Sequence, residues 1–192
     1  AVLFATGVFS SVGVIGMATG PTEETLSSSV TVAIAPDQSA LLTSSVGDVK
    51  VSVASGSVDS PVDLIYTPLS VGDIPGLPGD IINTSRVFDL SVSLDATGPL
   101  EDFSFGGPVT VTVELDLSTI ASSENNGSRI IIQHHEGTEG WQELPTTVDF
   151  SALTATAQVD SLSPFALTVK EAVPKPTPAS SPTPDAAADT AA

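Results

Sequence analysis

Two adjacent histidines followed by a glutamate, His134-His135-Glu136, are the residues of this chain best suited to metal or acid–base chemistry. Imidazole nitrogens and carboxylate oxygens are common zinc ligands. The three residues end an isoleucine-rich stretch with strand character, and adjacent residues of a strand point to opposite faces of its sheet. The two imidazoles therefore cannot bind one metal ion without a bulge. We interpret the cluster as a strand end that leads into a turn, and we assign no metal ligand to it.

Three further positions carry candidate binding or modification chemistry. Trp141 follows the glycine-containing turn at 136–140 and is expected to cap the edge of the core, with a carbohydrate-stacking platform as the alternative. Asn83 and Asn126 each begin an Asn-x-Ser/Thr pattern for N-glycosylation, and we expect both in surface loops.

The sequence offers no fingerprint of catalysis. It has no phosphate-binding glycine loop, nucleophile elbow or HExxH motif, and it has no cysteine. Disulfides, thiolate chemistry and Cys-based zinc sites are thereby excluded. The dispersed acidic residues favour a solvated surface, and calcium held by one or two Asp-rich loops is the alternative. We therefore expect a protein that is not an enzyme, with no catalytic or cofactor-binding residue.

The elements that must position these side chains are short strands. Five apolar residues between Val109 and Leu117 alternate with Thr110, Thr112, Glu114 and Asp116, which is the period of a strand with one buried face. Similar patterns predict strands at 30–34, 49–53, 62–68, 88–94, 129–135, 141–144, 146–150 and 153–159. Residues 36–45 and 70–85 are predicted loops. The fold class that follows is all-β, an antiparallel immunoglobulin-like β-sandwich.

Composition limits the partners of this domain. The chain has 192 residues, a formal net charge of −18 and only five basic residues. Such a surface repels nucleic acid and anionic lipid headgroups, and it keeps a protein soluble at high concentration. Aromatic residues make up 5% of the chain, so aliphatic side chains must fill the core.

The first twenty residues carry no charge and are long enough to span a bilayer as a helix. They can be a signal-peptide remnant, with small residues at Gly16 and Ala18, or a plain membrane anchor. The favoured interpretation is the N-terminus of a secreted subunit, buried against neighbouring subunits as a helix or as a donated strand. Its similarity to type IV pilins is loose, because Ala5 stands where they carry an acidic residue. The candidate assembly residues are Val2, Leu3, Phe4, Val8, Phe9, Val12, Val14 and Ile15.

Four regions follow from these patterns. Residues 1–20 are the hydrophobic segment, and residues 21–45 are a polar joint with a first strand. The sandwich is expected over 46–171. Residues 172–192 form a tail rich in Pro, Ala and Thr, which cannot bury enough apolar surface to offset its ordering entropy.

Residues 46–169 resemble a domain of large bacterial surface proteins that is related to the ZU-type domain of zona-occludens and netrin-receptor proteins. Three stretches carry the resemblance: VKVSVASGSVDSPVDLIYTPL, GPVTVTVELDL, and the closing IIIQHHEGTEGWQELPTTVDFSALTATAQVDSLSPFALTV. The resemblance implies a β-sandwich without catalytic residues in the bacterial versions. Some ZU-type domains cut their own backbone at a His-(Phe/Leu)-Ser/Thr motif. The matching triplet here, Ser161-Leu162-Ser163, keeps the hydroxyl and lacks the histidine base.

The sequence therefore favours a structural subunit of an extracellular, pilus-like surface filament or sheath. The subunit would be secreted to the cell surface and would assemble as a homo-oligomer through residues 1–20. Its partners would be copies of itself, without nucleic acid, and residues 1–20 could contact a membrane before assembly. The alternative is a membrane- or wall-anchored adhesin or stalk domain that binds carbohydrate or protein through loops such as 70–85.

Overall fold

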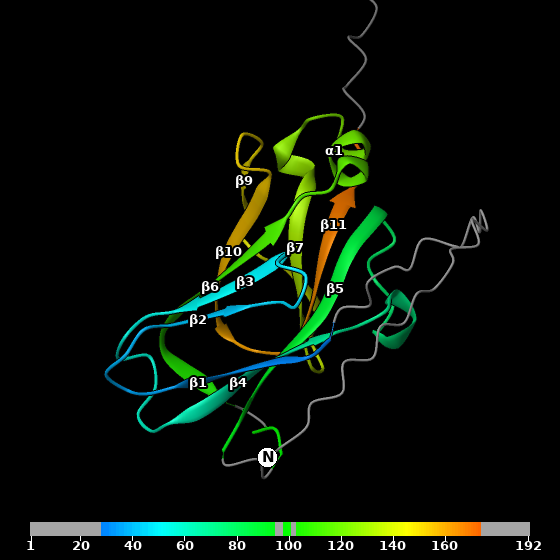
Figure 1. Cartoon of the computed structure of the whole chain (residues 1–192). Coiled ribbons are helices and arrows are strands. Elements are labelled where there is room, and N and C mark those ends of the chain that lie inside the picture. The colour runs from blue at the N-terminus through cyan, green and yellow to red at the C-terminus, as the bar shows by residue number, and fades with distance from the viewer. Residues whose placement is uncertain (1–27, 95–97, 101–102, 174–192) are drawn as a thin grey trace, which may run out of the picture.

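The computed structural model describes residues 28–94, 98–100 and 103–173, which form two antiparallel sheets packed as a sandwich (Figure 1). The hydrophobic segment 1–20, with all its candidate assembly residues, and the tail from residue 174 lie outside this part of the chain. The predicted antiparallel β-sandwich is confirmed. Its immunoglobulin-like detail stays a prediction.

Six strands make the larger sheet and five make the smaller one. In order across the larger sheet they are β1 (Val30–Ile34), β4 (Val62–Pro68), β5 (Ile81–Ser93), β11 (Pro164–Lys170), β7 (Ile130–Glu136) and β8 (Gly140–Glu143). The smaller sheet has the order β2 (Ala40–Thr43), β3 (Val49–Val53), β6 (Ser104–Glu114), β10 (Thr154–Ser161) and β9 (Thr147–Asp149). Three helical turns complete the described elements: η1 (Val71–Asp73), α1 (Leu117–Ser123) and η2 (Gly127–Arg129).

The core lies between the sheets and is filled by the alternating apolar residues. The smaller sheet contributes small and β-branched side chains, such as Val51, Val111 and Ala155, all fully buried. The larger sheet contributes the bulk, with the rings of Phe88 and Phe165 stacked at a centroid distance of 5.5 Å. Protein interiors are close-packed, so small side chains on one sheet leave room for large ones on the other.

Several predicted boundaries were wrong. Strand β2 lies inside the predicted loop 36–45, and β5 begins at Ile81, inside the predicted loop 70–85. A four-residue strand is too short to show a period, and the first half of β5 follows a run of Gly and Pro. The sheets also begin upstream of residue 46, because β1 and β2 are strands of the sandwich.

Helix α1 was not predicted, since Leu115 and Leu117 continue the alternation of β6. The strand ends at Glu114, and Leu117 is 82% exposed on the helix. Asp116 starts the helix: its Oδ1 accepts hydrogen bonds from Thr119 N at 2.7 Å and from Ser118 Oγ at 2.8 Å. Burial acts against the carboxylate, but these hydrogen bonds and the charge of Arg86 together lower the pKa of Asp116 below its ordinary value.

Replacing Asp116 with alanine is expected to lower the free energy of unfolding by roughly 0.5–2 kcal/mol, because an N-cap is lost. Urea denaturation at pH 7 measures the change. Asp116→Asn keeps an acceptor for the Thr119 amide and should lose less. Equal losses in the two variants would show that the charge of Asp116, and not its cap, stabilises this end of the domain.

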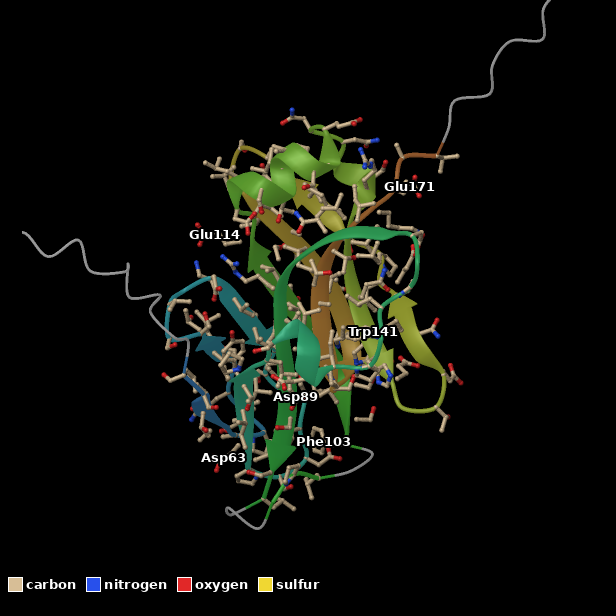
Figure 2. All side chains as sticks on the ribbon, turned by 90° about the vertical axis from the view of Figure 1, so that its right-hand side faces the viewer. Asp63, Asp89, Phe103, Glu114, Trp141 and Glu171 are labelled. Carbon is tan, nitrogen blue, oxygen red and sulfur yellow. The ribbon has the colours of Figure 1, made fainter. Side chains whose placement is uncertain are left out.

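A twelve-residue strap, residues 69–80, joins β4 to β5 and crosses the outer face of the larger sheet (Figure 2). It reaches as far as β8, where Trp141 Nε1 donates a hydrogen bond to Pro75 O at 3.1 Å. Gln133, Ala166 and Thr168 alternate with core residues and so face away from the core, yet each is 0% exposed. The strap crosses this outer face, which a tight β4–β5 hairpin would leave open to water.

Candidate functional site

A cleft of about 610 Å³ lies at one end of the sandwich, and we call it the end cleft. Asp89 and Phe103 lie on its wall, and both are seen in the lower half of Figure 2. Four segments meet there: the end of β5, residues 99–103 as far as they are described, the β7–β8 turn and the β10–β11 turn. Its polar lining comprises Asp89, Ser91, His134, His135, Glu136, Thr138, Glu139, Ser161 and Ser163.

His134 is a buried residue of the core that also borders the end cleft. Its side chain is 2% exposed, and its ring stacks on Phe165 with a centroid distance of 4.5 Å and an interplanar angle of 18°. Nδ1 lies 3.5 Å from Glu136 Oε1, while Nε2 has no hydrogen-bond partner within the described residues. Burial lowers the pKa of His134, and the nearby carboxylates of Glu136 and Asp160 oppose this only in part.

Stability should therefore fall as the pH drops from neutral. The unfolded chain protonates His134 near pH 6.5 while the native imidazole stays neutral, so the unfolded state binds more protons between 6.5 and the lowered native pKa. The slope contributed by one such group is at most about 1.4 kcal/mol per pH unit. Urea denaturation of the wild type and of His134→Gln between pH 5 and 7.5 measures it. Identical slopes for the two proteins would contradict the burial of His134 as a neutral imidazole.

The carboxyl group of Asp89 is half-buried in the end cleft, and this burial alters its pKa. Burial raises its pKa above the ordinary value, and a hydrogen bond with Ser91 offsets only part of this effect. No ion pair within the described part of the chain joins Asp89 to a cation. A half-buried carboxylate of this kind favours a positively charged or hydrogen-bond-donating ligand.

The prediction that the histidine pair ends a strand and leads into a turn is confirmed, because β7 ends at Glu136 and residues 137–139 form a turn. The two rings lie in different surroundings. His134 packs in the core against Phe165, and His135 makes an edge-on contact with Trp141 at 5.2 Å. Trp141 is half-buried on β8 and holds the strap. Within the described ranges no three His, Asp or Glu side chains are close enough to hold a metal ion.

The two glycosylation candidates lie in different settings. Asn126 is exposed at the start of η2, where its Oδ1 accepts a hydrogen bond from Ser128 N at 3.1 Å, as expected of a loop residue. The prediction of a loop was wrong for Asn83, which pairs with Val169 inside the sheet. Its amide donates to Ser122 Oγ of α1 at 3.0 Å. A glycan on Asn83 would have to displace that contact.

Ser163, the hydroxyl of the triplet related to self-cleavage, also borders the end cleft. Its Oγ donates a hydrogen bond to the backbone carbonyl oxygen of His135, and not to an imidazole nitrogen. The proton of the hydroxyl is therefore directed at a group that cannot remove it, and this geometry does not activate a nucleophile.

Sequence reasoning missed Asp89, Glu139 and Phe103 as neighbours in one cleft. Asp89 alternates with Phe88 and Leu90 and looks like any outward residue of a half-buried strand. Segments separated by more than seventy positions meet at the end cleft, and no local sequence pattern predicts that they meet. The turn containing Glu139 was predicted, but a turn does not reveal which strand ends lie beside it.

The described helical turns are all short, and none has the length and apolar character to cross a membrane. The sequence matches no model of a known protein family, and a comparison with curated proteins gives no match either.

Proposed function

We propose that this chain is a structural, non-catalytic subunit of an extracellular surface filament or sheath. The observation that carries the proposal is a separation of charge along the chain. Residues 1–20 contain no charged side chain, and every acidic and basic residue of a chain with net charge −18 follows them. An uncharged segment of this length in water favours burial against another apolar surface.

The sandwich supports the proposal as the outward-facing part of such a subunit. Its two sheets bury each other's apolar faces with residues between Ile34 and Val169, so the domain has its own core. Its acidic surface would keep the exterior of an assembly hydrated and would discourage lateral clumping. In this proposal the partners are copies of the same chain, the location is the cell surface, and residues 1–20 contact a membrane only before assembly.

Charge placed in the N-terminal segment tests the proposal in the full-length chain. The double variant Val8→Asp and Val14→Asp should remain monomeric in light scattering at concentrations where the wild type forms large species. The matched control, Ala179→Asp with Ala187→Asp, adds the same charge to the tail and should assemble like the wild type. Assembly of the Val8/Val14 variant, or a monomeric wild type, would count against a role for residues 1–20.

The end cleft favours a second candidate, an anchored adhesin or stalk domain that binds a ligand. Asp89 carries a half-buried carboxylate there that has no ion-pair partner among the described residues, and the aromatic ring of Phe103 lines the same cleft. An amino sugar or a lysine-containing peptide would supply a cation and apolar surface together. Calorimetric titration with glucosamine, and with glucose as the uncharged control, would test this candidate. Binding lost in Asp89→Asn would support it, and equal heats from both sugars would reject it.

A further inference from the structure

The two flanks of the sandwich differ in how their edge strands are protected. On one flank β8 carries Glu143, and β9 has three residues, follows Pro145 and ends at Asp149. Charges, prolines and shortness are the usual means by which proteins prevent an edge strand from pairing with another chain. This flank is therefore protected against strand addition.

The other flank is less protected: β2 is also short, with four residues, and Pro36 and Asp37 lie in the connection that precedes it, but the five-residue edge strand β1 itself carries no charge and no proline. Strands β1 and β2 form it, joined by the short connection 35–39, and neither contains a charged residue or a proline (Figure 1). Strand β1 pairs with β4 on one side, and no described strand pairs with its other side. In a chain with 23 acidic residues, five successive uncharged positions on an open edge form a surface to which another strand can add.

The apolar side of β1 is also incompletely covered. Ile34 is buried, whereas Val30 and Val32 are only half-buried although both pack against the core. On the neighbouring strand Ala40 is likewise half-buried, and Leu41 is 58% exposed. A strand placed beside β1 would take these valines out of water and would pair the open backbone groups of the edge.

We infer that residues 8–15 of a neighbouring copy add to the free edge of β1 as a donated strand. This inference rests on the proposed function and specifies its contact. The segment is uncharged, like the edge it would meet, and it contains the β-branched residues Val8, Val12, Val14 and Ile15. Donation from one copy to the next is a head-to-tail contact, and such contacts build open filaments when the rotation between copies does not close.

The absence of cysteine from the natural chain allows a direct test with full-length proteins. One protein carries Thr31→Cys, at an exposed position of β1, and a second carries Ser10→Cys or Ser11→Cys in the segment. Cross-strand neighbours lie within the reach of a disulfide, and only contacts between copies can link two single-cysteine proteins. The matched control carries Thr147→Cys, exposed on the protected edge strand β9.

After mixing, assembly and mild oxidation, mass spectrometry should find the 31–10 or 31–11 disulfide and at most traces of links to position 147. The donated strand would be overturned if position 10 or 11 formed disulfides equally with positions 31 and 147. Disulfides only between the N-terminal segments of two copies would also overturn it. A 31–11 link formed in a monomeric Thr31→Cys/Ser11→Cys protein, without linking in the mixture, would show that the segment folds back on its own β1 and would also overturn it.

An independent arm blocks the edge with charge. Thr31→Lys with Ala33→Lys alters two exposed positions of β1 and should abolish filaments while urea denaturation shows a folded domain. Thr147→Lys on β9 should leave assembly intact. If the wild type forms filaments that both lysine variants retain, the proposed function survives and the donated strand fails. If the wild type forms no filaments, the proposed function fails.

Discussion

Replacing Phe165 with alanine is expected to lower the free energy of unfolding by about 3–5 kcal/mol. The ring is fully buried at the centre of the larger sheet, between Phe88 and the imidazole of His134. Truncation removes the transfer free energy of the ring and leaves a cavity, because strands paired on both sides of β11 cannot move inward. Urea denaturation at pH 7, fitted to two states, measures the loss.

An exposed apolar residue gives the matched control for this variant. Leu41→Ala removes a side chain that is 58% exposed on the edge strand β2, and its effect should stay within about 0.5 kcal/mol. A loss near 1 kcal/mol for Phe165→Ala would be that of an average substitution. It would mean that the stack of Phe88, Phe165 and His134 does not form the centre of the core.

Replacing Gln133 with methionine is expected to raise the free energy of unfolding, in contrast to most core substitutions. The side chain is 0% exposed on the face of the sheet that the strap crosses, and neither atom of its amide has a hydrogen-bond partner among the described residues. A buried polar group left unpaired costs about 1–3 kcal/mol. Methionine has a similar length and no such group, so a gain of about 1–3 kcal/mol should follow.

Gln142→Met is the control, since Gln142 is exposed on β8 and its amide donates to Glu139 O at 3.3 Å. Its stability should be nearly unchanged. If Gln133→Met instead destabilises the domain, the amide of Gln133 is hydrogen-bonded in solution. The strap would then lie differently over the sheet from its position in Figure 2.

Most of the sandwich could be predicted because its strands alternate clearly and its turns contain glycine or proline. The strand at Val62–Pro68 was predicted to the residue, and so were those at Val30–Ile34 and Val49–Val53. In each, apolar residues at every second position bury one face, and that period is specific to strands. The tertiary structure therefore agrees with the local pattern in these regions.

The misses have a common physical cause: contacts distant in the chain decide the local structure. Ile81–Arg86 forms a strand because β11 offers a partner, not because its sequence alternates. Helix α1 is a seven-residue element rich in serine and threonine, and its only local signal is the cap at Asp116. The buried state of His134 depends on a stack with Phe165, thirty-one positions away.

The candidate site could be predicted only in part. Strand geometry alone predicted that the side chains of His134 and His135 point in different directions, and their rings contact different partners in the structure. Their neighbours in the end cleft could not be found, because the meeting of four segments is a property of the sheet order. The raised pKa of Asp89 likewise follows from burial by those segments and has no counterpart in the residues next to it.

Electron microscopy of negatively stained protein, purified from its native source, tests the central claim most directly. The claim predicts filaments or sheets of repeating subunits from the natural chain, and single particles from the full-length Val8→Asp/Val14→Asp variant at the same concentration. Single particles from both proteins would contradict a structural subunit. The end cleft, with its half-buried carboxylate at Asp89, would then be the place to look for the function of the domain.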